Sequence, residues 1–254
     1  MRRSWFVTAF CVCAVIALDT AFAEEPRPDA KPAQLGELAK PFKIAMELKT
    51  EEKTVQVDVF FVGDSAVEMD PEDPNSAAAI YDLKNLSWYD VAGKNRVTIA
   101  DCEKWAASSL KRSQNSLRRL EDPQQREFLS ALYVPRLKVT EPKDEKNELV
   151  VNNAVVEYRI TSAEKHALPQ RNRYFIYDRL NAYRKAFVNK APPFAQLELD
   201  RILESREVFP GTMATTIKSP YAEVRLDTKM RLIELTADEE RKITEAIARA
   251  QANP

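Results

Sequence analysis

Apolar residues occupy every second position over residues 42–48 and again over residues 55–61. A period of two is typical of a strand with one buried face. The charged Glu51-Glu52-Lys53 lies between the two runs and predicts a turn. The pattern therefore predicts a pair of adjacent antiparallel strands.

Four more short apolar runs follow, at residues 65–69, 78–83, 86–91 and 96–99. The connections between them are short enough for hairpins, which indicates an antiparallel meander.

The period changes to that of a helix after residue 100. Asp101 is expected to be a helix N-cap, because its carboxylate can accept bonds from free backbone amides. Asp122-Pro123 predicts a second start, since proline suits the first helical position. A helix pair is expected over about residues 101–133.

Strand and helix signals then alternate to the end of the chain. Asn152-Asn153 is expected to turn a hairpin, and Thr236 with Glu239 to form a capping box. The predicted elements are strands at 136–140, 149–151, 154–161, 174–177, 212–217 and 224–235, a polar loop at 163–171, and helices at 180–188, from 192 to about 205, and after 236.

Strands first, then a helical insertion, then more strands and helices predict an α+β fold. The expected architecture is a curved, half-barrel-like antiparallel sheet packed against helices, with a C-terminal helix. Residues 41–254 are expected to form a single domain, with a helical insertion at about 101–133.

The first residues have the pattern of a signal peptide. Arg2 and Arg3 precede an apolar run, and Ala21-Phe22-Ala23 is a small-x-small cleavage signal. The run is shorter than the roughly 20 residues that span a bilayer, which argues against an uncleaved anchor. Residues 1–23 are therefore expected to be removed and residues 24–40 to form a flexible leader, which predicts a periplasmic or extracellular protein.

Composition excludes several classes of function. Lys and Arg number 38 against 39 Asp and Glu, so the chain has no overall basic excess for a nucleic-acid partner. The four glycines are too far apart for a phosphate-binding loop, and no cofactor is expected.

The segment from Ile80 to Val91, which contains Trp88-Tyr89-Asp90, is followed by Arg96-Val97-Thr98-Ile99. This phrase resembles the central hairpin of periplasmic lipoprotein carriers of the LolA/LppX type, although Lys84-Asn85 stands where those proteins commonly have glycine. The resemblance implies a curved sheet that carries a lipid-like ligand.

Five aromatic residues are candidates to line an apolar ligand cavity: Phe60, Phe61, Tyr81, Trp88 and Tyr89. The alternative is that a helix covers this part of the sheet and makes an ordinary core.

Cys102 and His166 are the only cysteine beyond the signal peptide and the only histidine. As a dyad they would serve a thiol-dependent hydrolase, with the helix dipole lowering the thiol pKa. The structural interpretation, which we favour, is that Cys102 is a small core residue and His166 is exposed. No zinc site is expected, and the acidic segment 70–75 is interpreted as a solvated turn rather than a calcium site. The acid pairs Asp70/Asp73 and Glu239/Glu240 would serve a glycosidase only if they faced each other across a cleft.

These observations favour a non-enzymatic exported protein that binds a lipid or other apolar ligand on one sheet face. The alternative is an envelope scaffold or interaction protein without a cavity, with an exposed apolar patch near residues 180–205. In both, contact with a membrane is expected to be transient at most.

Overall fold

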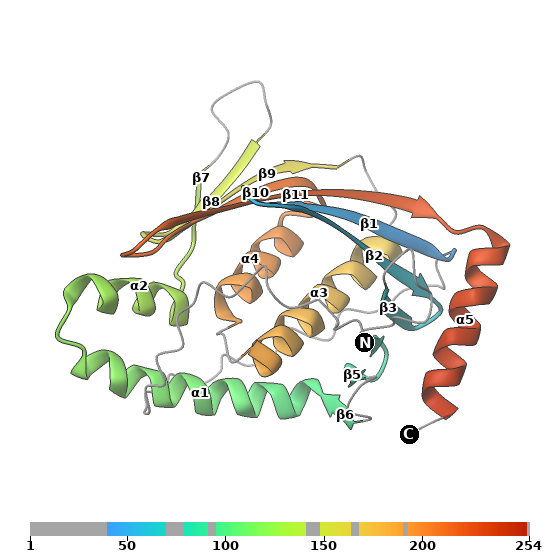
Figure 1. The fold of residues 1–254 in the computed structure, drawn as a ribbon, viewed down its shortest axis with the longest axis horizontal. Helices are drawn as coiled ribbons and strands as arrows, with labels where there is room; N and C mark the ends of the chain where they lie inside the picture. The colour runs from blue at the N-terminus through green and yellow to red at the C-terminus, as the bar shows by residue number, and fades with distance from the viewer. Residues whose placement is uncertain are drawn as a thin grey trace.

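A computed structural model of the chain describes residues 40–69, 79–90, 95–140, 148–163, 168–189 and 193–252. Within these ranges eleven strands form one open antiparallel sheet, in the order β6-β5-β4-β3-β2-β1-β11-β10-β9-β8-β7 (Figure 1). The strands are β1 (Phe42–Lys49), β2 (Thr54–Val62), β3 (Ser65–Met69), β4 (Ala79–Asp82), β5 (Ser87–Asp90), β6 (Asn95–Thr98), β7 (Lys138–Thr140), β8 (Glu148–Asn152), β9 (Val156–Ser162), β10 (Pro210–Lys218) and β11 (Glu223–Glu234).

The first six strands form the expected meander, each paired with the next. In the middle of the sheet, β1 pairs with β2 on one side and with β11, from the far end of the chain, on the other. Phe42 is opposite Phe61 on one side and opposite Glu234 on the other. The two halves of the chain therefore share one continuous sheet.

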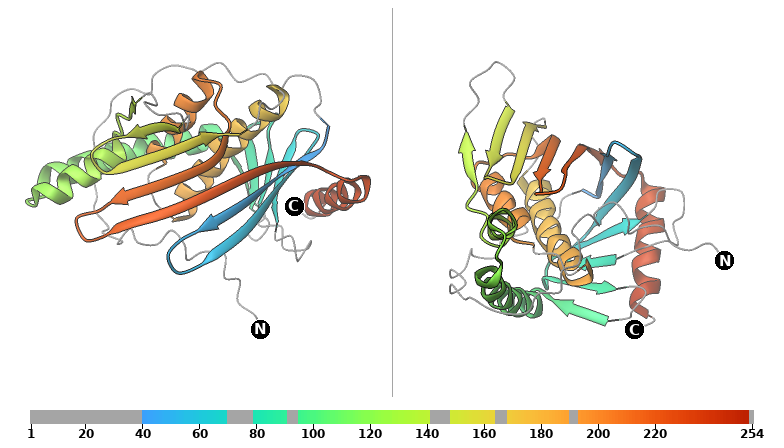
Figure 2. Two further views of the ribbon diagram at one scale, coloured as in Figure 1. Left: turned by 90° about the horizontal axis from the view of Figure 1, so that it is seen from above. Right: turned by 60° about the vertical axis from the view of Figure 1, so that its left-hand side comes forward.

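Five helices accompany the sheet in the described ranges: α1 (Ile99–Arg119), α2 (Pro123–Tyr133), α3 (Leu168–Asn189), α4 (Phe194–Ser205) and α5 (Ala237–Ala252). Helices α1 to α4 lie on one side of the sheet and α5 lies on the other (Figures 1 and 2). We call the side toward α3 and α4 the inner face and the side toward α5 the outer face. The main core lies between the inner face and α3, α4 and the start of α1.

The expected α+β class, antiparallel sheet, packed helices and C-terminal helix are confirmed. The curvature of the sheet and the single-domain organisation stay predictions.

The expectation of a strand at Tyr174–Tyr177, preceded by a polar loop up to residue 171, is wrong. These residues belong to α3, which starts at Leu168 and continues to Asn189. Five consecutive residues from Arg173 to Tyr177 are buried, because the helix is surrounded by the sheet and by other helices. A short apolar run of this kind has no one-sided periodicity to distinguish helix from strand.

The start of α1 also differs from the expectation. Thr98 is the N-cap, and Asp101 is the third helical residue of a capping box in which the two side chains bond each other's backbone amides. The expected start of α2 is present, with Pro123 as the first helical residue, and Asp122 caps the helix by accepting a bond from the Gln124 amide at 2.8 Å. The predicted box between Thr236 and Glu239 is present at α5.

Candidate functional site

The five candidate aromatic residues are divided between the two faces of the sheet. Phe61, Tyr81 and Trp88 lie on the inner face, in the main core. Phe60 belongs to a small outer cluster that includes Ile243 of α5, and Tyr89 packs against that cluster. Successive strand residues point to opposite sides, so these five residues do not line a common surface.

On the inner face, α3 fills the space above the aromatic residues. Phe61 stacks on Phe42 with ring centroids 4.5 Å apart. Tyr177 of α3 makes edge contacts with both Phe61 and Tyr81, at 5.6 and 5.0 Å. Side chains of the protein itself therefore occupy this half of the inner face, as in the alternative of an ordinary core.

A buried polar network connects α3 to strands β3 and β4. The Tyr177 hydroxyl donates to Glu68 at 2.6 Å, and the Arg184 guanidinium forms an ion pair with the same carboxylate. Arg184 Nε also donates to the Tyr81 hydroxyl at 2.6 Å, and that hydroxyl donates to Asn181 at 3.1 Å. Burial and the nearby Glu68 raise the pKa of both tyrosines well above the ordinary value, so both remain protonated donors.

Sequence reasoning did not identify this network, although one signal for it was present. Glu68 lies two residues after the buried Ala66 in β3, so both side chains point to the inner face of the sheet. An acid at an inward strand position indicates a buried partner, because an unpaired buried charge is strongly unfavourable. The partner lies in a distant helix and has no local signature.

A second polar cluster joins α3 to α4. Gln196 donates to Asp178 at 3.1 Å and to Asp200 at 2.8 Å, and the Tyr174 hydroxyl donates to Asp178 at 3.3 Å. Burial raises the pKa of both acids, and for Asp200 the neighbouring Asp178 raises it further. Two like charges so close disfavour the state in which both carboxyls are ionised, which acts in the same direction as burial.

Asp178 and Asp200 both accept a bond from the Gln196 amide group, so their two carboxyl groups lie close together. The pair lies at the α3–α4 interface, whereas the pocket described below is lined by other residues. Of the acid pairs named from the sequence, Glu239 is occupied in the α5 capping box and in a contact with Lys43. Asp70 and Asp73, with the whole 70–75 segment, lie outside the described residues.

The thiol at residue 102 does not have the properties of a nucleophile. Cys102 is fully buried in the main core. Burial, with smaller contributions from Asp101 and Glu103, raises its pKa to about 12. The expected lowering by the helix dipole is thus outweighed, and the structural interpretation of Cys102 as a core residue is confirmed. His166 lies outside the described residues.

One end of the inner face carries apolar side chains that are only half-buried. Leu48 and Val55 face each other at the end of the β1–β2 hairpin, and Val224 and Leu226 lie at the start of β11. Met46 and Val57, closer to the centre of the sheet, pack against the main core. We call Leu48, Val55, Val224 and Leu226 the apolar end of the inner face.

The outer side of the same strand ends is charged or polar. Lys49, Gln56 and Arg225 are exposed there. An apolar set on one side and a solvated set on the other is the normal pattern of a sheet whose inner side is covered. At the apolar end, that cover is incomplete, because the four side chains are half-buried.

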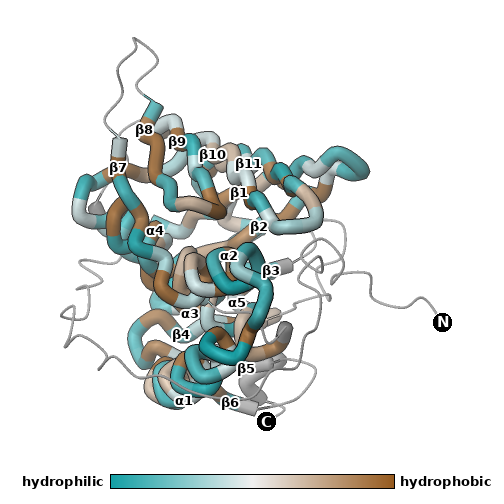
Figure 3. The backbone as a smooth tube through the Cα atoms, turned by 90° about the vertical axis from the view of Figure 1, so that its left-hand side faces the viewer, coloured by the Kyte–Doolittle hydropathy of each residue, from teal (hydrophilic) through white to brown (hydrophobic). Residues whose placement is uncertain are grey.

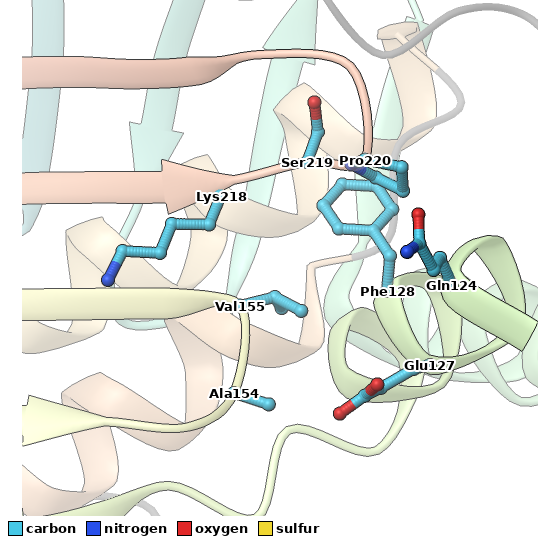
Figure 4. Close-up of a pocket in the computed structure, with 8 residues that line it drawn as sticks. All are labelled: Gln124, Glu127, Phe128, Ala154, Val155, Lys218, Ser219 and Pro220. Atoms are coloured by element: carbon cyan, nitrogen blue, oxygen red, sulfur yellow. The ribbon is translucent and has the colours of Figure 1, made fainter.

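Helix α2 contacts the turn between β10 and β11, where Gln125 bonds to Tyr221, and it has no fully buried residue. Between α2, the β8–β9 turn and the end of β10 lies a shallow pocket of about 180 Å³. Figure 4 shows Phe128 of α2 facing Pro220, with Val155 beside them and Glu127 and Lys218 nearby. Ligand pockets usually measure about 300–1,000 Å³, so in this arrangement the pocket is too small for a lipid-sized ligand unless α2 moves.

No group of three or more His, Cys, Asp or Glu side chains that could hold a metal ion occurs in the part of the chain that the structure describes. In the same part, no helix combines the length and the apolar character needed to cross a bilayer. Comparisons of the chain with models of known protein families and with curated proteins give no match.

Proposed function

We propose that this chain is an exported, non-enzymatic protein that binds a lipid acyl chain or a similar apolar ligand at the apolar end of the inner face. One observation carries the proposal: Leu48, Val55, Val224 and Leu226 point to the side of the core and yet are half-buried. An apolar ligand laid across them would complete the cover that the helices provide elsewhere, with a hydrophobic gain proportional to the area removed from water.

Helix α2 is the element that we expect to adjust. Its apolar side chains are half-buried, including Phe128 at the pocket. A helix held by few buried contacts opens at low free energy. The resemblance of the hairpin at residues 80–99 to lipoprotein carriers and the signal-peptide pattern of residues 1–23 support the same proposal.

This proposal moves the ligand contacts away from the five aromatic residues of the sequence prediction. Phe61 and Tyr81 are covered by Tyr177, and Phe60 packs near Ile243. They support the fold on which the apolar end is built.

The test is native mass spectrometry of the protein purified from its own cell envelope, with an organic extract analysed alongside. A stoichiometric apolar mass is expected. Val55→Lys with Leu226→Lys should abolish it, because each would place a charge on the inner face. The matched control is Gln56→Lys with Thr216→Lys, which adds the same charges to the outer face of neighbouring strand positions. A bare protein mass for the unaltered chain, or equal loss in both variants, would contradict the proposal.

A second candidate is an envelope interaction protein, and one observation favours it. Phe187 and Val188 near the end of α3 are 38% and 56% exposed, in the region where the sequence predicts such a patch. This function predicts a bare protein mass together with a specific protein partner that is lost when Val188 is changed to Ser.

A further inference from the structure

Positive charge is concentrated in one segment of a nearly neutral chain. Residues 104–120 contain five basic residues and no acidic one, although the whole chain has a net charge of −1. The five are Lys104, Lys111, Arg112, Arg118 and Arg119. Apart from Lys104, they lie in the second half of α1.

The helix presents these charges on the side away from the core. Its buried side chains include Cys102, Ala106 and Leu117. At 3.6 residues per turn, Lys104, Lys111 and Arg118, each seven residues apart, share the opposite face. Arg112 and Arg119 flank this stripe, and all five residues are exposed.

Four of these five cations form no salt bridge in the described ranges. Within the described ranges, no salt bridge involves Lys104, Lys111, Arg112 or Arg119. The helix contains two acids, Asp101, which is occupied by its bonds to Thr98, and Glu103, which directly precedes Lys104. By contrast, Arg159 and Lys229 on the outer sheet face are each paired with carboxylates.

An exposed apolar pair lies beside this helix. Phe187 packs edge-on against Trp105 of α1, with ring centroids 5.9 Å apart, and Val188 follows it at 56% exposure. Lys185, on the same turn of α3, is also exposed. Figure 3 shows α1 at the opposite end of the molecule from strands β7 to β10.

We infer that the outer side of α1, together with Phe187 and Val188, docks on a bilayer surface that contains anionic phospholipid. Clusters of four to eight Lys and Arg residues bind anionic bilayers through summed electrostatic attraction, and exposed apolar side chains add contact with the acyl boundary. Charge complementarity selects an anionic surface, and the neighbouring apolar pair selects a lipid surface over a purely polar polyanion.

This inference deepens the proposed function and rests on it, because a protein that carries an apolar ligand must meet a membrane to load or release it. Helix α1 leads directly into α2, across the three residues from Leu120 to Asp122. The docking face is therefore covalently adjacent to the element that borders the pocket.

The test is flotation of the mature protein with vesicles of phosphatidylcholine alone and with vesicles that contain 30 mol% phosphatidylglycerol. Binding is expected only to the anionic vesicles, and it should disappear in 0.5 M NaCl, where charges are screened within a few ångströms. Lys104→Glu with Lys111→Glu should weaken partitioning about ten-fold or more. The matched control is Lys84→Glu with Lys138→Glu, an equal change of charge at exposed strand and turn positions.

Val188→Ser tests the apolar contribution without disturbing the Trp105–Phe187 contact, and it should weaken vesicle binding several-fold. Circular dichroism establishes that every variant is folded. Absence of binding to anionic vesicles, or equal loss in the two charge-reversed variants, would overturn the inference. Displacement from vesicles by an equal charge concentration of polyglutamate would also overturn it, in favour of an acidic protein partner.

The two proposals fail separately. If the protein floats with anionic vesicles but its native mass shows no bound ligand, the docking inference stands and the proposed ligand function fails. If the protein co-purifies with an apolar ligand but does not bind anionic vesicles, the proposed ligand function stands and the docking inference fails.

Discussion

Arg184 of α3 forms an ion pair with Glu68 of β3, although 116 residues separate them in the chain. Both side chains are largely buried, with 19% and 11% of their area exposed. Tyr81 and Tyr177 complete the set of partners. The pair is thus a polar connection that specifies where the central helix sits on the sheet.

Removing one partner of this pair should destabilise the fold strongly. Arg184→Met leaves the Glu68 charge buried without its cation, and we expect a loss of about 3 kcal/mol in the free energy of unfolding. Urea denaturation at pH 7 measures it. The control is Arg201→Met, whose partner Glu198 lies in an exposed pair, where a change within about 0.5 kcal/mol is expected. Similar losses in both variants would contradict the assigned role.

The acid pair of Asp178 and Asp200 should make stability fall as pH rises. Both pKa values are raised by burial in the folded state, so the folded protein holds protons that the unfolded chain releases above a pKa of about 3.9. The contribution of the pair is full below that value and is lost as pH rises through the folded-state pKa.

Asp200→Asn removes one of the two titrating groups, so its stability should vary less between pH 4 and pH 8 than that of the unaltered protein. The free energy of unfolding of the variant, compared with that of the unaltered protein, should be higher at pH 8 than at pH 4 by about 1 kcal/mol or more. Urea midpoints at several pH values measure the difference. Parallel pH profiles for the two proteins would show that the pair is not protonated.

Cys102 should be protected from alkylation in the folded protein. Its burial and its pKa of about 12 leave very little thiolate at pH 8. Iodoacetamide labelling followed by mass spectrometry should be at least about 100-fold slower in buffer than in 6 M guanidinium chloride, where the thiol has an ordinary pKa. Rapid labelling of the folded protein would revive the nucleophile hypothesis.

Helix α2 should exchange its amide hydrogens faster than α3. It has no fully buried residue, whereas most residues of α3 between Arg173 and Tyr183 are buried. Hydrogen exchange read by mass spectrometry should show α2 protected at least about ten-fold less than α3. Addition of the envelope lipid extract should slow exchange in α2 and leave α3 unchanged. Equal protection in the free protein would show that α2 is not the adjustable cover.

Features whose cause lies within a few residues could be predicted from the sequence. The alternation in residues 42–48 predicts β1, and Asp122-Pro123 predicts the start of α2. Thr236 and Glu239 are three residues apart, and their mutual bonds need nothing beyond the helix that they begin.

The sequence was ambiguous where burial surrounds an element on every side. Residues Tyr174 to Tyr177 are all aromatic or aliphatic and have no polar side to reveal a helical period, and tertiary packing decided that they belong to α3. Phe60 and Phe61, as neighbours in a strand, point to opposite faces, but what covers each face depends on α5 and α3, which are far away in the chain.

By itself, then, the sequence determined the α+β class, the meander, most helix starts and the near balance of charge. Only the tertiary structure decided that β1 pairs with β11, that Glu68 meets Arg184, and that Leu48 and Leu226 remain half-buried. The physical reason is range. Backbone hydrogen bonds, caps and periodicity act between neighbours in the chain, whereas burial and ion pairing are set by whichever distant segment fills the remaining space.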